Sequence, residues 1–175
     1  MSQVDGAAGA STLVEAARWL LSSAESRGLT VAVAESLTGG EVVSALVSVP
    51  GASAVVVGGV VAYATRIKSQ VLGVDERRLE RTGPVDGGVA EQMASGVAAL
   101  MGADLGLATT GVAGPGPADG HPAGTVHVAV VAPWGQRHRE LRLSGDRPQI
   151  RRATVMEVCE LAIGFLQKDE YGPQP

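Results

Sequence analysis

The chain has few aromatic residues, a single cysteine and no apolar run long enough to span a membrane. Aromatic residues are 3% of its 175 residues and hydrophobic residues are 45%, so valine, alanine and leucine must fill the core. Cys159 cannot form an internal disulfide, and we expect it to be a small buried apolar side chain in a helix. This cysteine usage fits a reducing, cytoplasmic setting, and the first residues lack the pattern of a signal peptide. We therefore expect no association with a membrane.

Positive charge is scarce overall, and the formal net charge is −4. Nucleic-acid phosphates are bound through clustered lysine and arginine, so this charge argues against a nucleic-acid-binding protein. Basic residues do gather at 137–142 and 147–152, where a small anionic ligand could meet local positive charge. The three histidines and the lone cysteine lack the spacing of a metal site or a catalytic triad, so we expect neither a metal nor a cofactor.

Glycine is abundant, and the 24 glycines stand at the ends of predicted elements rather than in a regular period. Apolar periodicity and capping residues predict helices over residues 12–27, 39–49, 65–72, 75–81, 86–101 and from about 146 onward. Strand patterns cover residues 30–34, 54–64, 105–110, 125–131 and 137–143, the last with one wet face, as at a sheet edge. The alternation predicts a three-layer α/β/α sandwich. We expect one domain over residues 11–168, with flexible ends at 1–10 and 169–175.

The most informative stretch is V-A-V-A-E-S-L-T-G-G-E-V-V, residues 31–43. It reads as a buried strand that turns at Glu35 and Ser36 into a helix. The first N–H groups of a helix have no partner within the helix, and the positive end of its dipole favours anions. Ser36 is therefore placed to act as a nucleophile beside an oxyanion site, or to hold a phosphate.

A second glycine-rich loop, residues 111–116, follows another predicted strand. In α/β sheets, ligands bind outside the carboxyl ends of the strands. Either loop alone could be no more than a tight turn. Two such loops in one domain favour a ligand site.

A serine nucleophile needs a base, and the chain contains no G-x-S-x-G, S-x-x-K or H-E-x-x-H motif around Ser36. Tyr63 and Lys68 flank a predicted strand-to-helix turn. A lysine whose charged form is disfavoured by burial can be neutral and act as a base, and a tyrosine hydroxyl can relay a proton. The alternative for Lys68 is a surface lysine on a short amphipathic helix.

Six separated motifs follow one another along the chain. They are A-E-S-L-T-G-G at residues 34–40, G-G-V-V-A-Y-A-T-R-I-K-S-Q-V-L-G-V at 58–74, T-G-P-V at 82–85, T-G-V-A-G-P at 110–115, P-A-G-T-V-H-V-A at 122–129 and S-G-D-R at 144–147, with Arg151 one turn on. In this order they resemble the CinA family, namely the C-terminal domain of the competence/damage-inducible protein CinA. The resemblance covers the chain from about Val14 to Leu166.

The resemblance implies an activity and a site. Enzymatic members of the family are amidohydrolases that convert nicotinamide mononucleotide to nicotinate mononucleotide and ammonia with a Ser–Lys pair and a tyrosine. Carried over by motif, the catalytic residues are Ser36, Lys68 and Tyr63. The resemblance also implies a mixed, mainly parallel sheet, a pyridine nucleotide as the small-molecule partner, and a homo-oligomer, dimeric or higher. The large N-terminal domain of full-length relatives has no counterpart here, so we expect the stand-alone form.

The expected substrate-binding residues fall into the two loops and the start of the last helix. They are Glu35, Thr38, Gly39, Gly40, Thr110, Gly111, Ala113, Gly114, Pro115, Gly116, Arg147 and Arg151. Backbone N–H groups near residues 38–40 are expected to stabilise an oxyanion, and Arg147 or Arg151 is expected to pair with the phosphate. Which loop takes the phosphate and which forms the oxyanion site stays open.

Two departures from the family pattern concern specificity. Thr65 stands where the family often has asparagine, and Pro117-Ala118 stand where the loop often continues with glycines. The rival interpretations are a catalytically silent nucleotide-binding module of the same family and a structural or partner-binding α/β domain.

Overall fold

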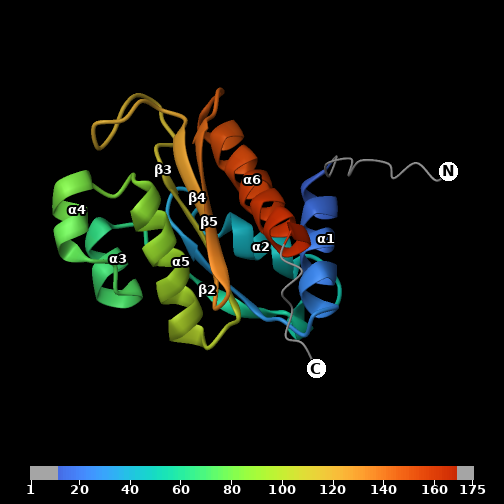
Figure 1. Ribbon diagram of the computed structural model, residues 1–175. Coiled ribbons are helices and arrows are strands. Elements are labelled where there is room, and N and C mark those ends of the chain that lie inside the picture. The colour runs from blue at the N-terminus through green and yellow to red at the C-terminus, as the bar shows by residue number, and fades with distance from the viewer. Residues whose placement is uncertain (1–11, 169–175) are drawn as a thin grey trace.

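A five-stranded sheet with helices on both faces forms the centre of the molecule (Figure 1). This computed structural model describes residues 12–168, so the expected flexible ends at 1–10 and 169–175 lie outside the described residues. The strands are β1 (Val31–Glu35), β2 (Val56–Val61), β3 (Leu105–Gly111), β4 (Thr125–Ala132) and β5 (Gly135–Arg142). The helices are α1 (Leu13–Glu25), α2 (Glu41–Val47), α3 (Thr65–Leu72), α4 (Glu76–Thr82), α5 (Gly87–Met101) and α6 (Arg147–Lys168), with a short 3-10 helix, Ala52–Ala54, before β2.

The sheet is mixed, and its strand order is β2-β1-β3-β4-β5. Strand β1 pairs in parallel with both β2 and β3, while β4 runs antiparallel to β3 and to β5. Every strand except β4 therefore shares one direction, as expected of a mainly parallel sheet. Strand β5 lies at an edge, which confirms the interpretation of its single wet face.

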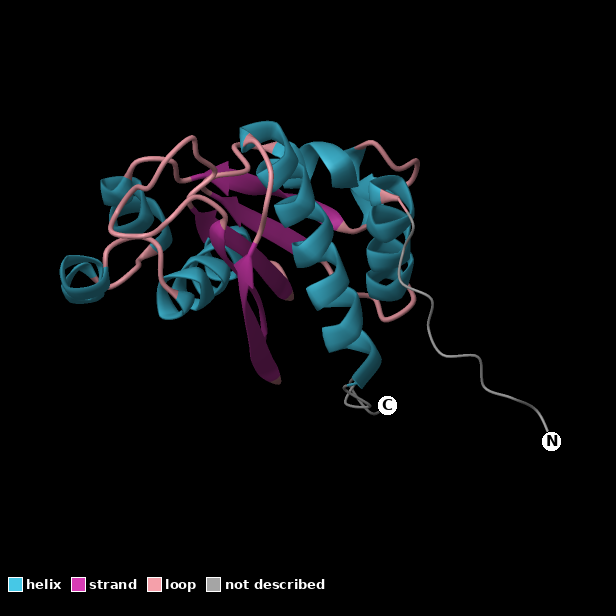
Figure 2. Ribbon diagram, turned by 90° about the horizontal axis from the view of Figure 1, so that it is seen from above, coloured by secondary structure: helices cyan, strands magenta, loops and turns pink. Residues whose placement is uncertain are grey.

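The helices form two layers, so the predicted three-layer α/β/α sandwich is confirmed. Helices α1, α2 and α6 cover one face of the sheet, and α3, α4 and α5 lie on the other (Figures 1 and 2). No helix within residues 12–168 is both long and apolar enough to cross a membrane.

The two faces of the sheet are packed differently. The α6 side carries larger aliphatic side chains, and Cys159 of α6 is buried among them, as predicted. The α5 side presents small residues, and they let α5 come close: a Cβ added at Gly106 would collide with the Ala94 carbonyl. This close approach sets the position of α5 and of the neighbouring α3, which carries Lys68.

Some helix boundaries differ from those predicted, and others are confirmed. The helix expected over 39–49 spans only 41–47, because Gly39 and Gly40 adopt left-handed backbone angles, with φ of 61° and 102°. Thr65 is the first residue of α3, not its cap; Ala64 occupies the cap position and makes no side-chain cap. The caps at Thr12, with Glu15, and at Asp86 are confirmed.

Candidate active site

A direct hydrogen bond joins the two residues predicted to do the chemistry. Lys68 Nζ donates to Ser36 Oγ at 2.9 Å and to the Ala62 carbonyl at 2.7 Å. Ser36 follows the last residue of β1, and Lys68 lies on α3, which begins shortly after the neighbouring strand β2. The parallel pairing of β1 and β2 thus brings together side chains that are 32 positions apart.

Lys68 is buried, with 1% of its surface exposed, so the alternative of a surface lysine is wrong. Burial lowers the pKa of its ammonium group to about 8, and the negative charge of Asp119 opposes that shift. Both acceptors of Nζ, a hydroxyl and a carbonyl, are neutral, so neither compensates a positive charge in full. The amine therefore loses its proton close to neutral pH and can then accept the proton of Ser36.

The turn after Ser36 is organised by Glu35, which is fully buried. Its carboxylate accepts hydrogen bonds from the N–H groups of Gly40 at 2.9 Å, Val42 at 3.1 Å and Val43 at 2.9 Å. An internal anion thus satisfies the first turn of α2, at the positive end of the helix. The carboxylate of Glu35, predicted to bind substrate, is thus enclosed and bound to the protein's own backbone.

Two of the three backbone N–H groups predicted as oxyanion donors have partners inside the protein. The Gly40 N–H binds Glu35, and the Gly39 N–H donates to the Ser36 carbonyl at 3.2 Å. Within residues 12–168, the N–H groups of Leu37 and Thr38 have no hydrogen-bond partner. Leu37 lines the pocket beside Ser36, whereas Thr38 is buried outside the pocket lining, so the unpaired N–H group on a pocket-lining residue is that of Leu37.

A pocket of about 230 Å³ opens above the Lys68–Ser36 pair. The predicted site residues that line it are Ser36, Tyr63, Lys68, Thr110, Gly111, Ala113, Gly114, Pro115, Gly116 and Arg147. In the described part of the chain, Glu35, Thr38, Gly39, Gly40 and Arg151 lie outside the pocket lining. The glycine-rich loop after β3 therefore supplies much of the pocket lining, and the turn after β1 contributes Ser36 and Leu37.

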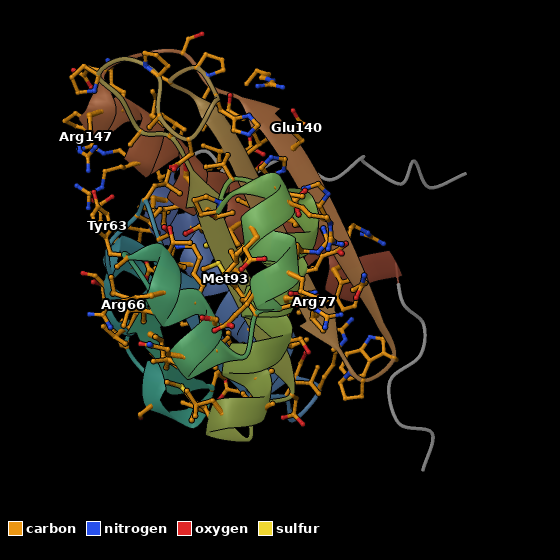
Figure 3. All side chains as sticks on the ribbon, turned by 90° about the vertical axis from the view of Figure 1, so that its left-hand side faces the viewer. Tyr63, Arg66, Arg77, Met93, Glu140 and Arg147 are labelled. Atoms are coloured by element: carbon orange, nitrogen blue, oxygen red, sulfur yellow. The ribbon has the colours of Figure 1, made fainter. Side chains whose placement is uncertain are left out.

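Tyr63 lies at the rim of the pocket, with 62% of its surface exposed. Its hydroxyl accepts a hydrogen bond from Arg147 Nη2 at 3.0 Å, and Arg147 Nη1 donates to the Gly114 carbonyl at 2.8 Å (Figure 3). Tyr63 therefore contacts Arg147 and not Ser36 or Lys68 in this state. The tyrosine and the loop carbonyl together hold the guanidinium of Arg147 at the mouth of the pocket.

Two other predicted residues have structural partners. Thr38 Oγ1 and Thr109 Oγ1 share a buried hydrogen bond of 2.8 Å, which ties the β1 turn to β3. Thr110 Oγ1 donates to the Pro84 carbonyl at 2.7 Å, although Thr110 also lines the pocket.

Sequence reasoning missed several pocket residues, and Asp119 is the most consequential. Asp119 lies in the loop between β3 and β4 with a φ of 49°, lines the pocket, and acts on Lys68 through its charge. A loop has no regular spacing of apolar residues from which the position of an acidic side chain could be predicted. The place of Asp119 in the pocket therefore became visible only with the path of the loop. The other missed lining residues are Leu37, Pro84, Val85 and Val112, whereas Thr65 and Ala118, singled out as departures from the family pattern, also line the pocket.

The arginines of the basic stretch at 137–142 have partners within the protein and lie outside the pocket lining. Arg139 pairs with Glu157 at 2.7 Å, Arg142 pairs with Glu140, and Arg137 Nη1 donates to the Gly164 carbonyl at 2.9 Å. Among the described residues, no cluster of three or more histidine, cysteine, aspartate or glutamate side chains could hold a metal ion.

The fold and the Lys68–Ser36 pair define a class of protein: a three-layer α/β domain with a serine and a buried lysine at the carboxyl ends of parallel strands. The chain belongs to the CinA family, since it matches the CinA C-terminal domain over residues 14–166. It is 50% identical over 135 residues to a CinA-like protein of Frankia casuarinae, covering 77% of this chain and 31% of that relative. It is 46% identical over 140 residues to a putative competence-damage inducible protein of Desulforamulus reducens, covering 80% of this chain and 34% of that relative. The chain thus spans about a third of the length of these relatives.

Solved structures of the family share the whole fold. A competence/damage inducible protein from Agrobacterium tumefaciens is 37% identical, with a TM-score of 0.85 and coverage of 93% of this chain and 100% of that chain. A CinA superfamily protein from Escherichia coli is 29% identical, with a TM-score of 0.84 and coverage of 94% and 95%.

Proposed function

We propose that this protein is an amidohydrolase that converts nicotinamide mononucleotide to nicotinate mononucleotide and ammonia. The observation that carries the proposal is the 2.9 Å hydrogen bond between Lys68 Nζ and Ser36 Oγ at the base of a pocket. Membership of the CinA family supports the choice of substrate. A cytoplasmic homo-oligomer, implied by the same family resemblance, belongs to this proposal as well.

Acylation begins with Lys68 in its neutral form. The amine takes the proton of Ser36 Oγ as the oxygen attacks the carboxamide carbon, and the carbonyl electrons move onto oxygen. The unpaired N–H group of Leu37, a residue that lines the pocket, is the donor we assign to that oxyanion. When the tetrahedral intermediate collapses, the C–N bond breaks and the Lys68 ammonium gives its proton to the leaving nitrogen, which departs as ammonia.

Deacylation repeats the same proton movements with water. Lys68, neutral again, takes a proton from a water molecule as it attacks the ester carbon. The ester bond to Ser36 Oγ then breaks, and the proton returns to Oγ as nicotinate mononucleotide leaves. No other acid or base is needed, because the lysine is deprotonated at the start of each half-reaction.

Arg147 supports a phosphorylated substrate. Its guanidinium lies at the pocket mouth, held by Tyr63 and the Gly114 carbonyl, while Ser36 and Lys68 lie at the base. A nucleotide whose carboxamide reaches Ser36 would bring its phosphate toward the mouth. A cation fixed by two contacts loses little entropy when it binds an anion there.

The test is ammonia release from nicotinamide mononucleotide by purified protein, with Ser36→Ala as the matched variant. We expect turnover by the wild type and none by Ser36→Ala, whose nucleotide affinity should stay within about tenfold, or about 1.4 kcal/mol. Turnover by Ser36→Ala at the wild-type rate would disprove the serine mechanism. Tight nucleotide binding without ammonia release by the wild type would instead support the catalytically silent module.

A further inference from the structure

Arg151 of α6 donates hydrogen bonds to the backbone of the turn that carries Ser36. Its Nε donates to the Leu37 carbonyl at 3.0 Å, and its Nη2 donates to the Thr38 carbonyl at 2.7 Å. The same Nη2 pairs with Glu41 at 2.8 Å. A Cβ added at Gly39 would lie 3.4 Å from Nη2, so the guanidinium packs directly over the turn.

Each of these contacts fixes a whole peptide unit. In a trans peptide the C=O and the N–H lie in one plane and point in opposite directions. The Leu37 carbonyl shares its peptide with the Thr38 N–H, so a guanidinium bound to that oxygen turns the Thr38 N–H away from α6. The Thr38 carbonyl likewise shares its peptide with the Gly39 N–H, which donates to the Ser36 carbonyl. Arg151 thereby sets the path of the chain on both sides of Thr38.

Two side chains of opposite charge, Glu35 and Arg151, bind the backbone of this turn. The Glu35 carboxylate binds N–H groups at the start of α2, and the Arg151 guanidinium binds the carbonyls just before it. The backbone N–H groups left over belong to Leu37 and Thr38, next to the nucleophile. A turn fixed in this way keeps Ser36 Oγ within reach of Lys68 and keeps its neighbouring donors in a constant direction.

We propose that Arg151 is a positioning residue for Ser36, acting through the Leu37 and Thr38 carbonyls, and not a ligand of the substrate's phosphate. As a statement about catalysis this rests on the proposed function. It divides the two arginines of α6 by role: Arg147 lines the pocket, whereas Arg151 binds the back of the nucleophile turn.

The experiment compares Arg151→Met with Arg147→Met and with Arg152→Met. Arg152 is the exposed neighbour on α6 and serves as the matched control. For ammonia release from nicotinamide mononucleotide, Arg151→Met should lower kcat by about tenfold or more and change KM by less than about threefold. Arg147→Met should raise KM by a larger factor than it lowers kcat, and Arg152→Met should behave as the wild type. A rise in KM with unchanged kcat in Arg151→Met would overturn the proposal in favour of a phosphate ligand.

A second readout needs no nucleotide substrate. A fluorophosphonate probe reacts with an activated serine, so its labelling rate reports the state of Ser36 alone. Arg151→Met should label several-fold more slowly than Arg152→Met, even if the wild type releases no ammonia. If Arg151→Met is labelled more slowly than Arg152→Met while the wild type does not hydrolyse nicotinamide mononucleotide, the proposed function is rejected and the positioning role is retained. Equal labelling rates would reject the positioning role.

Two further variants cover the case in which Arg151→Met does not fold. Arg151→Lys keeps a cation but has no planar fork for two carbonyls, and it should show a partial loss of both kcat and labelling rate. Glu41→Gln removes only the ion pair and should leave both rates unchanged. If a folded Arg151→Lys has the wild-type kcat and labelling rate, a planar guanidinium that binds both carbonyls is not required.

Discussion

Lys68 Nζ lies 2.9 Å from Ser36 Oγ, and the only other acceptor that it contacts among the described residues is the Ala62 carbonyl. Two neutral acceptors leave a buried ammonium without a direct counter-ion, while Asp119 acts on it only through its charge. The consequence is a lysine that changes protonation state near pH 8 instead of at its usual 10.5.

Replacing Lys68 by arginine should remove activity almost as completely as replacing it by alanine. Arginine keeps the positive charge but does not release a proton in this pH range, so it cannot serve as the base. We expect kcat to fall by at least about 100-fold in both variants. Steady-state ammonia release measures this, and retention of most activity by Lys68→Arg would show that charge and not proton transfer is what the site needs.

The activity of the wild type should rise with pH and level off above about pH 8. The active form of Lys68 is the neutral amine, and burial lowers its pKa to about 8. Below that value kcat/KM should fall by about tenfold for each pH unit. A profile that stays flat from mildly acidic to alkaline pH would contradict a lysine base.

Asp119→Asn should move the acid limb of that profile to lower pH. The Asp119 carboxylate raises the pKa of Lys68 against the effect of burial, so its removal lets the amine deprotonate more easily. The expected result is a lower apparent pKa in kcat/KM with the plateau retained. An unchanged limb would mean that solvent screens the Asp119 charge.

Nicotinamide riboside, which lacks the phosphate, should be a much poorer substrate than the mononucleotide. Binding energy from a remote phosphate helps to orient the reacting carboxamide, so kcat and affinity should both fall. Arg147→Met should reduce the preference for the mononucleotide over the riboside, because Arg147 is the cation at the pocket mouth. Equal catalytic efficiency on the two substrates would remove Arg147 from the phosphate site.

Stability should decline in mildly acidic solution because of His127. Its Nδ1 lies 2.9 Å from Nε2 of His138, and the rings stack with centroids 5.1 Å apart. Burial, followed by the charge of His138, lowers the pKa of His127 in the folded protein, although Glu140 and Asp86 oppose the shift.

Between the lowered pKa and the usual value of about 6.5, the unfolded chain binds more protons than the folded one. The free energy of unfolding therefore decreases as the pH falls below about 6.5. Denaturant titrations at several pH values measure this decrease, which should be smaller in His127→Gln. An identical pH dependence in that variant would assign the effect to other groups.

Much of the fold could be predicted from the sequence, because helix caps and apolar patterns depend on residues that are close together in the chain. The capping box of Thr12 and Glu15 and the cap at Asp86 each depend on residues within one helical turn. The apolar residues on nearly both faces of β4 are typical of a buried strand, and the charged alternation of β5 predicted an edge. The position of Ser36 just after a buried strand was equally clear.

The partners of the site residues were decided by the tertiary structure alone. Lys68 reaches Ser36 because β2 pairs in parallel beside β1, and Arg151 reaches Thr38 across 113 positions of sequence because α6 packs on the same face as α2. Glu35 carries a carboxylate and Arg151 a guanidinium, and both were predicted to bind substrate. Residue type alone is compatible with that role. Glu35 is buried and Arg151 is half-buried, and the hydrogen bonds of both side chains go to the protein's own backbone, since a charge removed from water must find partners inside the fold. The sequence by itself therefore determined which side chains could do the chemistry, whereas strand order and helix packing decided which of them face the pocket.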